Sequence, residues 1–225
     1  MISGIKPKII LFAFFLIAVS REAFAYDNGD FQIWNSNSQE KQISEKAKVT
    51  AEEEFRYADN ANQLYYHHYD VGFFYAFNKN FDLSLNYRHI YERRKGKFRI
   101  ENEPCVNAVF KWDMLGFSFS DRNRVEYRHF DYQTDFWRYR NTIAARFPWE
   151  FTRFKIRPYL SDELFIAFRG TAFNNNRFYS GAGFTAAKNI KGEFYYLLQH
   201  TRTVGKTTTN WPFINVFGAK FKLVF

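Results

Sequence analysis

Alternation of apolar and polar residues along nearly the whole chain constrains its fold most strongly. In residues 81–91, Phe81, Leu83 and Leu85 alternate with Asp82 and Ser84. Because successive side chains of a β-strand point to opposite faces, this pattern predicts a strand with one apolar and one polar face. The apolar face is aromatic in nearly every such segment, and Phe, Trp and Tyr make up 22% of the 225 residues.

The alternating segments are long enough to cross a membrane, since a tilted transmembrane strand needs roughly 9 to 11 residues. The strands of a soluble β-sandwich also alternate between apolar and polar residues, so the pattern alone does not decide which face contacts water. Three observations favour apolar faces turned to lipid. The apolar faces are aromatic, the alternation covers the whole chain after its first 25 residues, and the final strand ends in Phe225. We therefore predict an all-β fold, a transmembrane antiparallel up-and-down β-barrel.

The strand count is ambiguous. Bacterial single-chain barrels have even numbers of strands, whereas the pattern yields eleven segments. We expect twelve strands if residues 116–119 complete an additional hairpin, or ten if residues 31–43 stay outside the wall. The polar stretch 92–103 reads as a connection, and its basic residues 93–97 form a candidate outer loop. The segments are residues 31–43, 47–57, 65–77, 81–91, 106–112, 121–130, 136–147, 154–168, 178–186, 193–201 and 213–225.

The first 25 residues have the three regions of a secretory signal peptide. Lys6 and Lys8 precede an apolar run at residues 9–19, and a small-residue cleavage site follows at residues 23–25. A single barrel domain is then expected over residues 26–225, exported to the bacterial outer membrane. Loss of three cations and one acid with the signal lowers the formal charge from +9 to +7. Export makes nucleic acid an unsuitable partner, and favours outer-membrane lipid, lipopolysaccharide or small anionic solutes.

Charged residues gather on the polar faces. In residues 121–130, DRNRVEYRHF, the arginines and Glu126 share one face, and Val125 and Tyr127 share the other. If the aromatic faces turn outward, the charges line the barrel interior. The expected interior residues are Arg88, Arg122, Arg124, Arg128, Arg138, Arg140, Arg146, Arg157, Lys220 and Lys222, with Glu52, Glu54, Glu126 and Glu163.

Two interpretations of these charges remain open. Arginine and glutamate on neighbouring strands can form salt bridges that fill a small barrel and fix its register. Alternatively, ten cations facing four acids would favour anions in a narrow pore. A lipid-modifying enzyme and a loop-mediated binding or adhesion protein are further alternatives.

The sequence contains few candidate catalytic or metal-binding residues. Ser84, Ser161 and His68 are expected to face inward, but no spacing ties a serine to a histidine as nucleophile and base. His67 and His68 point to opposite faces of a strand, so they do not share a metal ion. We expect no catalytic residues, no metal and no cofactor. Cys105 is the single cysteine, which excludes an intrachain disulfide.

Several motifs carry a family resemblance. EEEFRY at residues 52–57, RNRVEYR at 122–128, RYRNTIAARFPW at 138–149 and FGAKFKLVF at 217–225 resemble a family of bacterial outer-membrane barrels, domain-of-unknown-function family 2490. That family has no assigned activity. The terminal strand with Phe221, Leu223 and Phe225 is similar to the signal by which the barrel assembly machinery recognises its clients, which implies that machinery as a partner.

Overall fold

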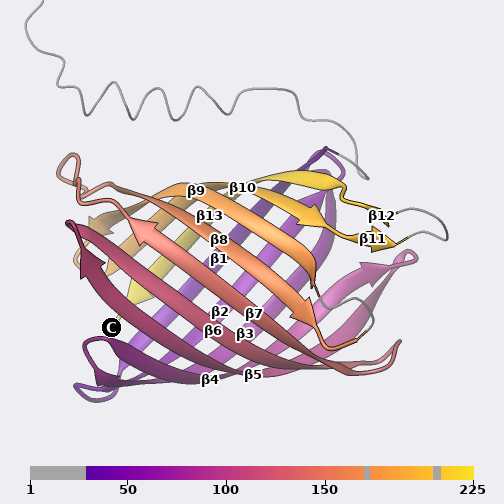
Figure 1. Ribbon diagram of the computed structural model, residues 1–225, viewed down its shortest axis with the longest axis horizontal. Coiled ribbons are helices and arrows are strands. Elements are labelled where there is room, and N and C mark those ends of the chain that lie inside the picture. The colour runs from indigo at the N-terminus through magenta and orange to yellow at the C-terminus, as the bar shows by residue number, and fades with distance from the viewer. Residues whose placement is uncertain (1–28, 170–172, 205–208) are drawn as a thin grey trace, which may run out of the picture.

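The computed structural model describes residues 29–225, except residues 170–172 and 205–208. Eleven strands form one closed barrel, which Figure 1 shows from the side. The predicted all-β barrel is thus confirmed. The predicted signal peptide lies outside the described residues. Among the described residues, no helix is long and apolar enough to cross a membrane.

The strands follow one another around the wall in chain order. A separate two-stranded ribbon, β11 (Thr203–Val204) and β12 (Thr209–Asn210), forms in the connection between the last two wall strands of the chain. The wall consists of β1 (Asp30–Gln42), β2 (Ala47–Ala58), β3 (Gln63–Asn78), β4 (Phe81–Arg94), β5 (Lys97–Met114), β6 (Phe117–Phe130), β7 (Phe136–Arg146), β8 (Arg157–Ala167), β9 (Phe173–Ala187), β10 (Ile190–Thr201) and β13 (Phe213–Val224).

A parallel pair closes the barrel. β1 runs parallel to β13, with Asn35 beside Ala219, whereas all other neighbouring wall strands are antiparallel. An odd number of strands closes only with such a pair, and β1 then begins at one end of the barrel while β13 ends at the other. We call these the N-terminal end, where Asp30 lies, and the C-terminal end, where Val224 lies.

The expected counts of twelve and ten strands are therefore wrong. Residues 31–43 do not stay outside the wall, because β1 bonds to both β2 and β13. No additional hairpin forms at residues 116–119 either. Leu115 and Gly116 make a tight turn with φ of 52° and 81°, and one unbroken strand, β6, follows. The expectation of an even number of strands was wrong because a parallel pair allows a barrel with an odd number of strands to close.

The polar stretch 92–103 is strand rather than connection. Only Lys95 and Gly96 form the turn, while β4 extends to Arg94 and β5 begins at Lys97. Extension of β5 places Glu101 and Glu103 on the same face as Cys105, and all three are buried. Sequence reasoning missed these two acids because it began this strand at residue 106, whereas β5 begins at Lys97.

The outer wall is mainly apolar. Val71, Leu85 and Trp137 are each at least half exposed, whereas most polar side chains on the alternate positions are buried or half-buried. One exception lies on β6 and β7, where Asp121 accepts hydrogen bonds from Asn123 and Asn141 at 3.1 and 2.5 Å. These polar groups bond one another within the wall, which lowers the cost of an apolar surrounding.

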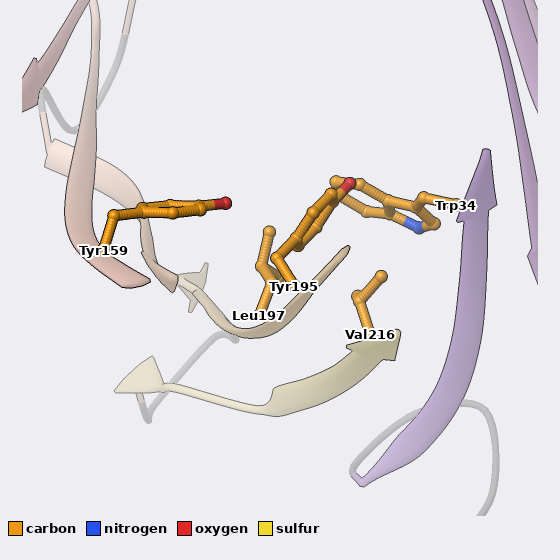
Figure 2. Close-up of a cluster of buried hydrophobic side chains, with 5 residues drawn as sticks. All are labelled: Trp34, Tyr159, Tyr195, Leu197 and Val216. Atoms are coloured by element: carbon orange, nitrogen blue, oxygen red, sulfur yellow. The ribbon is translucent and has the colours of Figure 1, made fainter. Parts of the chain in front are cut away.

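An apolar cluster occupies one side of the interior. Figure 2 shows Trp34, Tyr159, Tyr195, Leu197 and Val216, contributed by β1, β8, β10 and β13. Tyr195 lies against Gly218, where an added Cβ would come within 1.9 Å of the Tyr195 ring. A glycine is therefore required at this position.

Candidate functional site

The charged face of β6 lies inside the barrel. The register opposes Glu126 to Arg138 and Arg124 to Arg140 on β7. Because opposed side chains in an antiparallel pair lie close together, this register brings carboxylate and guanidinium groups into contact. Glu126 is fully buried, and Arg124 and Arg140 are nearly so.

Glu126 binds three arginines. Arg138 Nε donates a hydrogen bond to Oε2, and Arg140 Nη1 donates one to Oε1 at 2.9 Å. Arg124 Nη1 lies 3.6 Å from Oε1. The single carboxylate thus joins β6 to β7 through charge-assisted hydrogen bonds, which are stronger than neutral ones.

Glu163 repeats this arrangement on β8. Arg140 Nη2 donates to its Oε1 at 2.8 Å, and Arg122 Nη2 does so at 3.1 Å. Arg177 of β9 donates to Oε2 at 3.4 Å. Arg140 therefore bridges Glu126 and Glu163, and the contacts continue from β6 to β9.

Glu103 extends the contacts in the other direction. Arg138 Nη2 donates to its Oε2 at 2.9 Å, and Arg88 Nη1 of β4 donates to its Oε1 at 3.4 Å. Glu101 takes two hydrogen bonds from Arg128, at 2.5 and 2.7 Å. We name the whole set the arginine–carboxylate lattice: Arg88, Arg122, Arg124, Arg128, Arg138, Arg140 and Arg177 with Asp70, Glu101, Glu103, Glu126 and Glu163.

The lattice meets the apolar cluster across the interior. The Arg177 guanidinium lies 4.9 Å from the Trp34 ring, and that of Arg56 lies 3.8 Å from the same ring. Tyr179 donates a hydrogen bond to Glu163 Oε2 at 3.2 Å. The charged lattice on one side and the aromatic side chains on the other therefore occupy the cross-section of the barrel interior together, as side chains do in small barrels.

A cavity lies toward each end of the barrel. One, of about 380 Å³, is lined at the N-terminal end by residues that include Arg56, Arg94 and Arg202. The other, of about 430 Å³, is lined at the C-terminal end by residues that include Arg146 and Arg157. The two cavities share no lining residue.

The remaining predicted interior residues lie apart from the lattice. Glu54 pairs with Arg56 at 2.5 Å, and Glu52 lies 3.2 Å from His68 Nε2. Arg146 and Arg157 line the cavity at the C-terminal end. Within the lattice, seven arginines face five acids, which is a smaller excess of cations than the ten to four expected for the interior as a whole.

Sequence reasoning missed four members of the lattice. Glu101 and Glu103 alternate with Asn102 and Pro104, so both faces of that segment look polar or irregular and the alternation is hidden. Arg177 precedes the expected start of its strand by one residue, and Asp70 received no role as an arginine partner. Continuing the alternation of residues 106–112 back toward residue 101 would have found the first two.

The candidate catalytic residues do not form a catalytic set. Ser84 Oγ donates to Asn86 Oδ1 at 3.0 Å and accepts from Asn107 Nδ2 at 2.9 Å. His68 contacts the carboxylates of Glu52 and Glu54 instead of a serine. In the described part of the chain, no three His, Cys, Asp or Glu side chains are grouped as metal ligands would be.

The residues predicted to form an assembly signal lie in β13 and directly after it. Phe221 and Phe225 are exposed, and Leu223 is half-buried beside Ile190 of β10. A family model described as a protein of unknown function (DUF2490) matches residues 31–210. The chain belongs to the DUF2490 family.

The DUF2490 match covers β1 to β12 and ends before β13. No curated protein matches the chain, and no solved structure does. The family description assigns no activity, so a function for this DUF2490 protein has to be argued from its own residues.

Proposed function

We propose that this DUF2490 protein is an integral barrel of the bacterial outer membrane whose interior is closed, so that its role is structural rather than that of an open pore. The observation that carries the proposal is the contact of Glu103 on β5 with Arg138 on β7 at 2.9 Å. These strands are separated by β6, so the contact reaches across the inside of the wall.

The outer wall supports residence in a membrane. Its exposed side chains include aromatic residues on most strands, as expected for a surface in contact with lipid. Outer-membrane phospholipid and lipopolysaccharide are the partners that such a wall implies. Phe221, Leu223 and Phe225 would be read by the barrel assembly machinery during insertion.

The charge balance supports closure. Truncating one partner of a buried ion pair costs about 3–5 kcal/mol, so the buried charges resist separation. A narrow anion-favouring pore would need uncompensated arginines along a continuous path. Instead, each lattice arginine lies within 4.0 Å of a carboxylate, and the two end cavities share no lining residue.

A role without catalysis fits the same interior. A serine hydrolase requires a nucleophile and a base in hydrogen-bonding reach of each other. The partners of Ser84 are amides, and those of His68 are carboxylates. Small anionic solutes are then ligands of an end cavity rather than substrates or permeants.

Quenching by brominated lipid chains tests the membrane assignment. In single-tryptophan variants refolded into vesicles, Trp137, which is 51% exposed on the outer wall, should be strongly quenched. Trp34, which is 3% exposed inside the barrel, serves as the matched control and should be quenched little. Equal and weak quenching of both residues would contradict a lipid-facing wall.

A further inference from the structure

The cavity at the C-terminal end differs in charge from the lattice. Three acids line it, Glu52, Glu150 and Glu193, and two of these have partners, since Lys220 lies 3.0 Å from Glu193 and His68 lies 3.2 Å from Glu52. We name this cavity the basic vestibule. Its six cations are Arg146, Lys155, Arg157, Lys191, Lys220 and Lys222.

Four of these cations have no carboxylate partner. Among the described residues, no acid lies within 4.0 Å of Arg146, Lys155, Arg157 or Lys191. Arg157 instead donates to the Phe147 carbonyl oxygen at 2.5 Å. In the lattice, by contrast, every arginine has an acid. Cations that converge on one cavity without compensation repel one another, and an anion in the cavity relieves that repulsion.

A short hairpin fixes the backbone position of Lys155, one of these cations. Phe151 and Ile156 pair across a small hairpin in the connection between β7 and β8, and Lys155 lies in its turn with φ of 51°. The amide of Thr185 on β9 donates to the Phe154 carbonyl oxygen at 2.8 Å, which ties this hairpin to the wall. Lys155 is thus held at the vestibule, which Lys191 of β10 and Lys220 of β13 also line.

We propose that the basic vestibule binds a phosphate group. Arginine binds phosphate oxygens in a bidentate manner and lysine adds a point charge, so a mixed set suits a group with more than one oxygen and more than one charge. A volume of about 430 Å³ lies within the range of small-ligand sites. The phosphate could belong to a phospholipid headgroup or to a soluble phosphate ester. The proposal does not depend on closure of the barrel.

Calorimetric titration of inorganic pyrophosphate into the refolded full chain tests the proposal. An amine-oxide detergent is suitable because it carries no phosphate, and chloride keeps the ionic strength constant. The doubly substituted variant Arg146→Gln, Lys155→Gln removes two unpaired cations and should weaken binding at least about ten-fold, since a hydrogen bond to a charged group contributes that much or more.

A matched control removes the same charge from the same end. Arg153 and Lys188 are exposed near the vestibule but do not line it. Arg153→Gln, Lys188→Gln should therefore change pyrophosphate affinity less than about two-fold, as surface charges do. An equal loss in both variants, or no binding of pyrophosphate to folded wild-type protein, would overturn the proposal.

Two competitors distinguish the sources of the phosphate. Displacement of pyrophosphate by dihexanoyl phosphatidylglycerol but not by glycerol 3-phosphate would assign the vestibule to a lipid headgroup. The opposite pattern would assign it to a soluble phosphate ester. Either pattern supports phosphate binding, and neither bears on whether the barrel conducts ions.

Discussion

Glu103 and Arg138 form an ion pair at 2.9 Å although their strands, β5 and β7, are not neighbours in the wall. Salt bridges between adjacent strands fix local register. A bridge that passes over an intervening strand also occupies the interior. This pair therefore connects wall geometry with closure of the barrel.

The lattice should contribute strongly to stability. Glu126→Gln leaves Arg124, Arg138 and Arg140 without this buried counter-charge, and we expect a loss of about 3–5 kcal/mol in the free energy of unfolding. Urea titration read by heat-modifiable gel mobility measures the loss. Glu45→Gln, in the exposed turn after β1, is the control and should change stability little. Similar effects of both substitutions would contradict a stabilising lattice.

Gly218 should not tolerate a methyl group. Its Cβ would meet the Tyr195 ring at 1.9 Å, so Gly218→Ala should lower stability by about 1–3 kcal/mol, as overpacking does. The control is Gly183→Ala, where the nearest atom to an added Cβ is Arg146 Nη1 at 3.7 Å. Urea titration compares the two variants. Equal stability of both would show that Tyr195 does not lie over Gly218.

The parallel seam can be tested by cross-linking. In a Cys105→Ala background, a cysteine pair at positions 35 and 219 should oxidise to a disulfide, because these residues are register partners. Asn35→Cys with Phe221→Cys moves the second thiol about 7 Å along β13 and should react poorly. Gel mobility without reductant reads the result. Efficient linkage of the offset pair alone would disprove this register.

Acidification should loosen the connection between β6 and β7. Hydrogen bonds from His129 and from the Phe130 amide lower the pKa of Asp135 from 3.8 to about 2. A depressed carboxyl pKa adds stability that is fully present above about 4 and is lost as the pH falls through about 2. The hydrogen-exchange protection factor of the Phe130 amide should fall over that window.

Substitution of Asp135 gives the matching control. Asp135→Asn cannot ionise, so the protection of the Phe130 amide should be low and independent of pH between about 4 and 2. Unchanged protection of wild-type protein down to pH 2, or the same acid response in the variant, would show that Asp135 does not hold this connection.

The sequence predicts the strands well but not how they close. Alternation identified residues 81–91 and 213–225 as strands because each has one mainly apolar face. The parallel pairing of Asn35 with Ala219 is a long-range choice that no local pattern encodes. A rule about strand number then replaced a correct count of eleven with a wrong one.

Prediction of the site was incomplete for a related reason. The arginines of β6 were found because Val125 and Tyr127 mark the opposite face. Glu101 and Glu103 were missed because Asn102 and Pro104 occupy the alternate positions. Without those acids, the interior looked like an excess of cations that suited a pore. Which arginine meets which acid depends on register across several strands.

Single-channel recording in a planar bilayer tests closure most directly. Refolded protein, shown to be folded by its heat-modifiable mobility, is added under a salt gradient, with an open porin as positive control. The arginine–carboxylate lattice and the apolar cluster predict no conductance steps from the folded wild-type chain. Discrete steps with an anion-directed reversal potential would contradict a closed interior and would show that the arginines line a water-filled path.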